Sequence, residues 1–228
     1  MCDWFWGEHM SQAQSLRDTL EWILADRVRP HLKARGFTKS GRTFRRKRYP
    51  LWDTINFQGS RWNSVTPYSG FFVNIGVGST EIDAAQQQSD PQLPLLPIFD
   101  RRWERVVPEL PDQVTFDQHS DVQLLADGIC DGLTQVVAVT DRFTTTAELV
   151  NWAVTHNKLH RMQQVCRYLA TTGNLSLLSA YIGSLREQFG DQSRWAIFNR
   201  HLTEATGSCS AVLVQLGALD PLPGITAD

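Results

Sequence analysis

Residues Gly36–Ser79 read GFTKSGRTFRRKRYPLWDTINFQGSRWNSVTPYSGFFVNIGVGS, and this stretch decides the fold. Apolar and polar residues alternate along Trp52–Gln58 and again along Phe71–Gly78, which is typical of strands with one buried face. Thr43–Arg48 is predicted to be an edge strand, because charged side chains protect an exposed edge from pairing with another sheet. The stretch therefore predicts a small antiparallel sheet whose core face carries Ile55, Phe57, Phe71, Val73, Ile75 and Val77.

Helices are predicted before and after this stretch of the sequence. Before it, residues 11–35 place an apolar residue at every fourth position, at Leu16, Leu20, Leu24, Val28 and Leu32. Pro30 lacks a backbone N–H and disfavours the helical conformation at Arg29, so we expect either a kink or a second helix with Pro30 in its first turn. This helix is the natural cover for the core face of the sheet.

The rest of the chain reads as a loop, short elements and then helices. We predict a loop over Thr80–Pro97, a short helix over Trp103–Pro111, and a fourth short strand over Val114–Phe116. Helices follow from Ser120, and one is opened by the capping box of Thr145 and Glu148. The predicted fold class is α+β: a kinked N-terminal helix packed on a three- to four-stranded antiparallel sheet, followed by a mostly helical C-terminal part. The predicted organisation is a loose extension over residues 1–10, an α+β domain over 11–155, a helical extension over 156–216 and a frayed tail over 217–228.

Composition bounds the class of protein. The chain has 228 residues, of which 42% are hydrophobic, so it can build a real core. Its longest apolar runs fall far short of the roughly 20 residues that cross a bilayer, and its first residues lack the cationic segment of a signal peptide. We therefore expect a cytoplasmic protein with no membrane partner. The four cysteines form no CxxC pair, which favours free thiols over a disulfide framework.

Charge is distributed unevenly although the net charge is only −2. No acidic residue lies between Asp26 and Asp53, and ten basic ones do: Arg27, Arg29, Lys33, Arg35, Lys39, Arg42, Arg45, Arg46, Lys47 and Arg48. These ten leave 12 of the 22 basic residues to face all 24 acidic ones in the rest of the chain. The sequence is therefore electrically bipolar, with one strongly basic segment.

No motif points to catalysis. His156 and His160 are four residues apart, as in a zinc-protease helix, but Asn157 stands where that motif has its general-base Glu, and no third ligand suggests itself. Surface or capping histidines are the better interpretation. There is no GxSxG nucleophile motif and no phosphate-binding GxxxxGK[ST] loop. We predict no catalytic residue, metal or cofactor, and an unrecognised hydrolase is the outside alternative.

Two features are not explained by the scaffold. The first is the basic run Arg42, Arg45, Arg46, Lys47 and Arg48, with the aromatic residues Phe44, Tyr49, Trp52 and Trp62 close by. It is either a charged strand edge or a site that neutralises phosphates and stacks bases. The second is the set Asn56, Gln58 and Asn74, amides that strands disfavour unless something compensates. They either bond to the C-terminal helices or form a recognition face. Strand register decides whether Arg45 or Arg46 joins that face.

The pattern of LKARGF at 32–37, GRTF at 41–44 followed by an arginine, INFQ at 55–58 and FFVNIGV at 71–77 resembles a bacterial family, domain of unknown function 4304. The resemblance is clearest over residues 16–78. It implies an α+β fold and supplies no activity. The family's recurring positions would correspond to Gly36, Phe37, Phe44, Asn56, Gln58 and Asn74.

Three functional hypotheses follow. The leading one is a non-catalytic interaction module that binds an acidic protein partner through a basic sheet face, since complementary charge speeds association. The alternative is nucleic-acid binding through Arg42–Arg48 and the neighbouring aromatic residues. The third is self-association, in which the basic segment docks on the acidic half of another copy.

Overall fold

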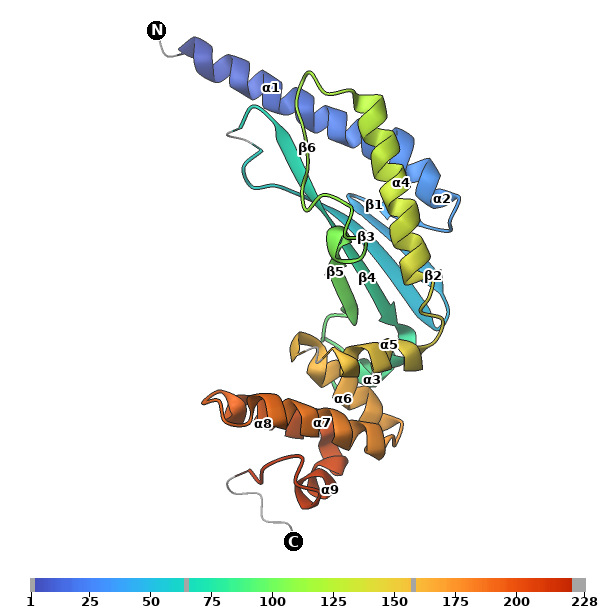
Figure 1. Ribbon diagram of the computed structural model, residues 1–228, viewed down its shortest axis with the longest axis vertical. Coiled ribbons are helices and arrows are strands. Elements are labelled where there is room, and N and C mark those ends of the chain that lie inside the picture. Colours follow the sequence, from blue (N-terminus) through green and yellow to red (C-terminus); the bar gives the residue numbers. More distant parts are fainter. Residues whose placement is uncertain (1–2, 64–65, 157–158, 223–228) are drawn as a thin grey trace. The chain divides into compact units, whose positions relative to one another are not determined.

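The computed structural model describes residues 3–63, 66–156 and 159–222 (Figure 1). The chain divides into two compact units. Unit 1 comprises Met1–Val77 and Phe99–Thr144, and unit 2 comprises Gly78–Ile98 and Thr145–Asp228. The predicted α+β class is confirmed: an N-terminal helix and an antiparallel sheet come first, and the C-terminal part is helical.

The sheet has six strands, more than the three or four predicted. They are β1 (Thr38–Ser40), β2 (Thr43–Arg48), β3 (Leu51–Gly59), β4 (Ser69–Ser79), β5 (Phe99–Arg102) and β6 (Val114–Phe116). Their order is β1-β2-β3-β4-β5, and β6 also pairs with β4. The strands expected near Thr43–Arg48, Trp52–Gln58, Phe71–Gly78 and Val114–Phe116 are all present. The expectation that Thr43–Arg48 forms an edge strand is wrong, because β2 pairs with β1 on one side and with β3 on the other. The two additional strands, β1 and β5, are too short to show an alternating pattern.

The first helical segment confirms the second alternative for Pro30. Helix α1 (Asp3–Trp22) continues as a π-helical turn, η1 (Ile23–Val28), and α2 (Arg29–Lys33) then has Pro30 in its first turn. Proline cannot donate to a carbonyl one turn back, and a wider turn just before it accommodates the missing bond. Ile23, Leu24, Val28 and Leu32 are fully buried. Because α1 begins at Asp3, residues 3–10 are helical and not the loose extension predicted.

A second long helix, α4 (Val122–Thr140), packs against η1 in unit 1. Its buried stripe includes Ile129, Leu133 and Val136. The short helix predicted at Trp103–Pro111 is only the 3-10 turn η2 (Trp103–Arg105). The Trp103 ring packs closely on α4 at Gly132, where an added Cβ would lie 3.0 Å from the ring. By length and composition α4 is the one helix of the described residues that qualifies as a candidate membrane span, a test that a core helix also passes.

Unit 2 is helical. It contains α3 (Thr80–Ser89), α5 (Thr146–Thr155), η3 (Leu159–Arg161), α6 (Met162–Thr171), α7 (Leu175–Phe189), α8 (Trp195–Thr206), η4 (Gly207–Cys209) and α9 (Ser210–Gln215). The predicted capping box of Thr145 and Glu148 is present at the start of α5. Helix α6 packs against α3, α7 and α8, with Val165, Leu178, Ile182, Leu185 and Leu202 in the core.

The loop predicted over Thr80–Pro97 is wrong for its first ten residues, which form α3. The Ser79 side chain accepts hydrogen bonds from the backbone N–H groups of Glu81 and Ile82, so it caps the helix. Ile82, Ala85 and Gln86 form a narrow buried stripe that the polar run after them conceals in the sequence.

The unit boundaries also differ from the predicted domains. Residues 78–98 and 145–155 lie in unit 2, not in one α+β domain over 11–155. The tail predicted to fray from residue 217 is packed as far as the structure describes it. Ala218 and Leu219 are buried, and the Asp220 carboxylate accepts hydrogen bonds from Arg186 and from the Trp195 indole at 2.7 Å. Residues 223–228 lie outside the described residues.

A buried ion cluster joins the β2–β3 hairpin to the end of α4. Asp53 is only 2% exposed, and its carboxylate accepts hydrogen bonds from Arg46 Nε and Arg48 Nε, both at 2.8 Å. Arg48 also donates to the backbone oxygens of Thr140 and Phe143, while Arg46 donates to Asp141. The carbonyls at a helix C-terminus have no partner within the helix, so the Arg48 guanidinium satisfies them. Arg46 and Arg48 are therefore part of the scaffold.

We predict that Asp53→Asn strongly destabilises unit 1. The amide removes the buried carboxylate to which both guanidinium groups are hydrogen-bonded and leaves only Asp141, about half exposed, to compensate them, so the free energy of unfolding should fall by about 3–5 kcal/mol. Urea-induced unfolding followed by circular dichroism measures it. Arg45→Gln, on the same hairpin but exposed, is the control and should change stability by less than about 0.5 kcal/mol. Equal losses in the two variants would contradict this role of Asp53.

Candidate functional site

Strand register determines which side chains share the outer face of the sheet. Directly paired residues of antiparallel strands project to the same side. Arg46 lies opposite Asp53 on the core face, whereas Arg45 lies opposite Thr54. We call the side opposite the core the open face, and α1, α2 and α4 belong to the core side (Figure 1). The open face carries Thr43, Arg45, Lys47, Trp52, Thr54, Asn56, Gln58, Phe72, Asn74 and Arg102, and also the acidic Asp100, which lies opposite Gly76.

The three amides predicted as a recognition set lie together on this face. Asn56 donates from Nδ2 to Thr43 Oγ1 at 2.9 Å and accepts at Oδ1 from Asn74 Nδ2 at 3.3 Å. Asn74 Nδ2 also donates to Gln58 Oε1 at 3.1 Å. We call these four residues the amide row. The members of the row come from β2, β3 and β4, and their side chains satisfy one another's hydrogen-bonding groups within the sheet. The sequence alone did not show this mutual bonding.

The amide row leaves hydrogen-bonding groups unused. Within the described residues, Asn74 Oδ1 and Gln58 Nε2 form no hydrogen bond, and Gln58 is exposed. Arg102 of β5 lies opposite Asn74, and its guanidinium stacks over the Phe72 ring at 3.9 Å from the centroid. The Nη1 atom of Arg102 is buried and has no hydrogen-bond partner in the described part of the chain. The amide row therefore offers an unused acceptor and an unused donor, and the partly buried guanidinium of Arg102 lies next to it.

The predicted basic run is divided between two faces. Arg45 and Lys47 are exposed on the open face, and neither has an ion pair or side-chain hydrogen bond with any residue that the structure describes. Arg42 pairs with Glu21 of α1 at 2.7 Å, and Arg46 and Arg48 bind Asp53. Of the predicted site residues, the structure thus brings together Arg45, Lys47, Asn56, Gln58 and Asn74 on one face and places Arg42, Arg46 and Arg48 elsewhere.

The basic residues upstream of the sheet are also partly engaged. Arg27 bonds to Gln123 and Asp127 of α4. Arg35 donates to His31 O at 3.0 Å and to Thr134 Oγ1 at 3.1 Å. The Arg35 charge and, above all, partial burial lower the pKa of His31. These arginines hold α2 and η1 against α4, and the basic segment as a whole does not form one surface patch.

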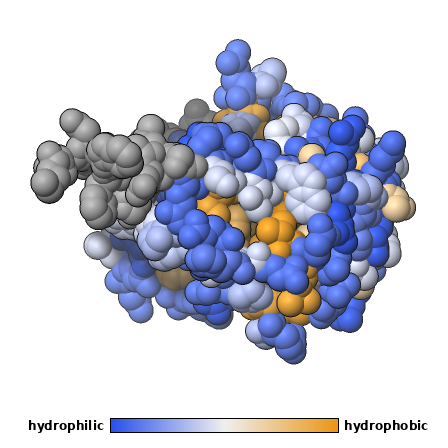
Figure 2. Space-filling model, turned by 90° about the horizontal axis from the view of Figure 1, so that it is seen from above, coloured by the Kyte–Doolittle hydropathy of each residue, from blue (hydrophilic) through white to orange (hydrophobic). Residues whose placement is uncertain are grey.

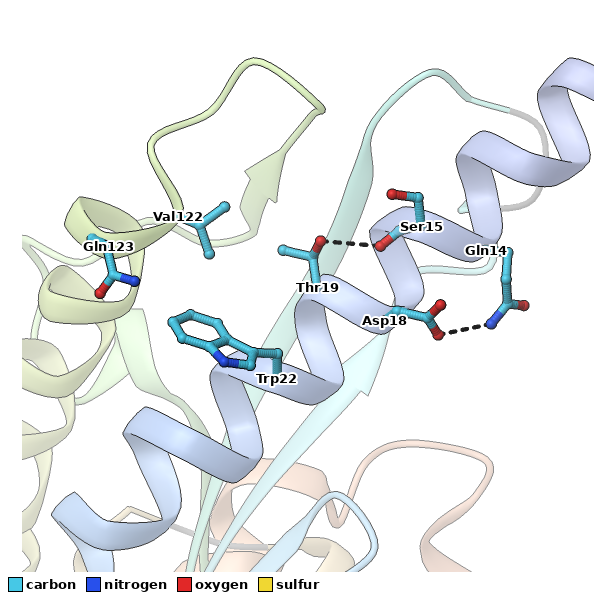
Figure 3. Close-up of a pocket in the computed structure, with 7 residues that line it drawn as sticks. All are labelled: Gln14, Ser15, Asp18, Thr19, Trp22, Val122 and Gln123. Atoms are coloured by element: carbon cyan, nitrogen blue, oxygen red, sulfur yellow. Dashed lines mark hydrogen bonds between the residues drawn. The ribbon is translucent and has the colours of Figure 1, made fainter.

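A groove runs between α1 and the start of α4. The residues that line it include no histidine, cysteine or lysine that could act as a nucleophile or general base. Figure 3 shows Trp22 and Val122 approaching it from the two helices, while Gln14 donates to Asp18 at 2.8 Å and Thr19 donates to Ser15 O at 3.0 Å. The Asp18 carboxylate and the Thr19 hydroxyl are thus bonded within α1. In the view from above, the surface is mostly hydrophilic, with small apolar hollows between polar side chains (Figure 2).

The described residues hold no group of three or more His, Cys, Asp or Glu side chains placed for a metal ion. His156 is the C-cap of α5 and stacks on Trp152 at 4.7 Å, whereas His160 belongs to η3. The two histidines therefore do not share one helix face, in agreement with the capping interpretation of His156. Burial raises the pKa of the Cys166 and Cys130 thiols, which makes them weak nucleophiles at neutral pH.

The fold and the open face define a small α+β protein whose sheet is covered by helices on one side and carries hydrogen-bonded amides and cations on the other. A family model described as domain of unknown function (DUF4304) matches residues 28–145, just over half of the chain. The chain belongs to this family, which confirms the resemblance seen in the sequence. The matched region contains α2, all six strands and α4, and hence the amide row. No curated protein and no solved structure matches the chain.

Sequence reasoning did not name five members of the open face as candidate site residues: Thr43, Thr54, Phe72, Asp100 and Arg102. Thr43 stands in the quoted GRTF pattern, two residues before Arg45, so its side of the strand follows once the register is known. Arg102 lies in a four-residue strand with no alternation, and nothing in the sequence indicates that it faces Asn74.

We predict that Asn56 and Asn74 are energetically coupled. Each hydrogen bond of the row contributes about 1 kcal/mol, so Asn56→Ala and Asn74→Ala remove the same shared bond and their effects on unfolding should not add. A double-mutant cycle measured by urea denaturation should give a coupling of at least about 0.5 kcal/mol. Asn56→Ala with Lys47→Ala, a pair without a mutual bond, is the control and should be additive. Additivity in both cycles would show that the row carries no coupling.

Proposed function

We propose that this chain is a non-catalytic interaction module that binds an acidic segment of a protein partner across the open face of its sheet. The observation that carries the proposal is the amide row flanked by Arg45 and Lys47, two exposed cations without a partner in the described residues. These groups lie on the side of the sheet that the helices of unit 1 leave uncovered.

The chemistry of the face suits an acidic polypeptide. Exposed Arg45 and Lys47 attract carboxylates and raise the association rate. The free Gln58 Nε2 and Asn74 Oδ1 match the carbonyl and N–H groups of an extended backbone. Arg102, held flat over Phe72, presents a guanidinium that accommodates a carboxylate through charge-assisted hydrogen bonds.

The positions of the aromatic side chains favour a protein over a nucleic acid. Base stacking requires exposed ring faces beside the cations. Among the rings of unit 1 whose exposure the structure describes, the two most exposed, Tyr49 at 84% and Trp62 at 56%, lie in the β2–β3 and β3–β4 connections. On the open face itself, Arg102 already covers one face of Phe72, and Trp52, which lies opposite Lys47, is half-buried. The cytoplasm of a bacterium is the setting we propose, in keeping with free thiols at Cys130, Cys166 and Cys209.

Fluorescence anisotropy with a labelled Asp/Glu-rich peptide and a single-stranded RNA of equal charge tests the proposal. We predict tighter binding of the peptide. The double variant Arg45→Glu/Lys47→Glu should weaken peptide binding by at least about tenfold, equivalent to about 1.4 kcal/mol, because it reverses the charges that meet the carboxylates. Circular dichroism checks that the variant folds.

The matched control is Arg29→Glu/Lys33→Glu, which makes the same charge change at two exposed positions of α2. It should alter peptide affinity much less than the open-face variant. Equal weakening by both variants would show that the effect comes from the net charge of the protein and not from the open face. Tighter binding of the RNA than of the peptide would favour the nucleic-acid alternative. If light scattering shows dimers at low salt, and the dimers do not bind the peptide, the result would instead support self-association.

A further inference from the structure

A pocket of unit 1, separate from the amide row, is lined by three arginines from three parts of the chain. Arg17 comes from α1, Arg42 from the β1–β2 turn and Arg61 from the connection after β3. The cavity has a volume of about 550 Å³. No motif marks this site in the sequence, because its residues lie 25 and 19 positions apart (17 to 42, 42 to 61).

Hydrogen bonds fix the walls of the pocket. The Asn63 side chain accepts from Gly70 N at 2.8 Å and donates to Gly70 O at 2.9 Å, so it fastens the connection to the start of β4. Arg42 is oriented by its bond to Glu21, and its Nη1 would lie 3.2 Å from a Cβ placed at Gly59. A larger residue at position 59 would therefore crowd this guanidinium.

The pocket has an excess of positive charge. Glu21 is bonded to Arg42, whereas Arg17 is exposed and has no ion pair or hydrogen bond to any described residue. Arg61 stacks over the Trp62 ring at 4.8 Å, a contact that leaves the guanidinium edge available. Ser69 also lines the pocket; it is 4% exposed, and its hydroxyl makes no side-chain hydrogen bond within the described part of the chain.

We infer that this pocket binds a small phosphorylated organic ligand. A planar guanidinium group binds two phosphate oxygens at once, and three such groups line this pocket together with the Ser69 hydroxyl. The volume lies within the roughly 300–1,000 Å³ of small-molecule sites and exceeds what one phosphate needs. Trp62 lies beside the pocket lining, next to Arg61, and is 56% exposed, so the ring face that Arg61 does not cover is available to the organic portion. This site is independent of the binding proposed for the open face.

Isothermal titration calorimetry with inorganic phosphate, AMP and adenosine tests the inference on the full chain. AMP should bind more tightly than phosphate, and adenosine should not bind measurably. Arg17→Gln should weaken AMP binding by about tenfold, because a charge-assisted hydrogen bond contributes about 1.5–3 kcal/mol. Arg17 has no structural partner, so the variant should fold, and circular dichroism verifies this.

Arg29→Gln is the matched control: it removes the same charge from an exposed arginine outside the pocket and should leave the affinity within about twofold. Equal effects of the two variants would overturn the site, as would the absence of binding by phosphate and AMP at millimolar concentration. Adenosine binding as tightly as AMP would overturn the role of the phosphate. If inorganic phosphate binds as tightly as AMP, the inference that the pocket also binds the organic portion of the ligand would be wrong.

Discussion

The buried carboxylate of Asp53 sets the register on which the rest of the sheet depends. Arg46 and Arg48 both bond to it, and both reach the end of α4, so the hairpin can pair in only one way. A slip by one residue would move Phe44 out of the core and turn every side chain of β2 to the opposite face. It would also leave buried guanidinium groups without their carboxylate, at a cost of several kcal/mol. The ion cluster thus specifies the open face without being part of it.

The same constraint explains why a basic segment of sequence does not become one basic patch. In a strand, consecutive side chains point to opposite faces. Arg46 and Arg48 therefore form internal ion pairs, while Arg45 and Lys47 between them reach solvent. Outside the strand, Arg27 and Arg42 are held by acidic partners on helices, Asp127 and Glu21 respectively. Charge counted along the chain overstates the surface charge, because ion pairs neutralise four of the ten cations of the segment, namely Arg27, Arg42, Arg46 and Arg48.

Local patterns in the sequence predicted the parts of the fold that depend on local physics. The alternation of Ile55 and Phe57, the capping box at Thr145 and the helix restart at Pro30 all follow from period, hydrogen-bond capacity and ring geometry. The misses depend on distant partners. Strands β1 and β5 have three and four residues and exist because β2 and β4 pair with them. The faces of Arg45 and Arg102 required the register, which no local pattern contains, and α3 was concealed by a polar run.

The amide row combines stability with readiness to bind. Asparagine is a poor strand former, at a cost of up to about 1 kcal/mol. The bonds from Asn56 to Thr43 and from Asn74 to Asn56 and Gln58 offset this cost within the sheet, so the row does not need a partner in order to fold. Each bond also holds one amide in one orientation. A partner that meets Asn74 Oδ1, Gln58 Nε2 and Arg102 therefore pays less conformational entropy than it would on freely rotating side chains. The internal bonds of the row thus favour, and do not oppose, its use as a binding surface.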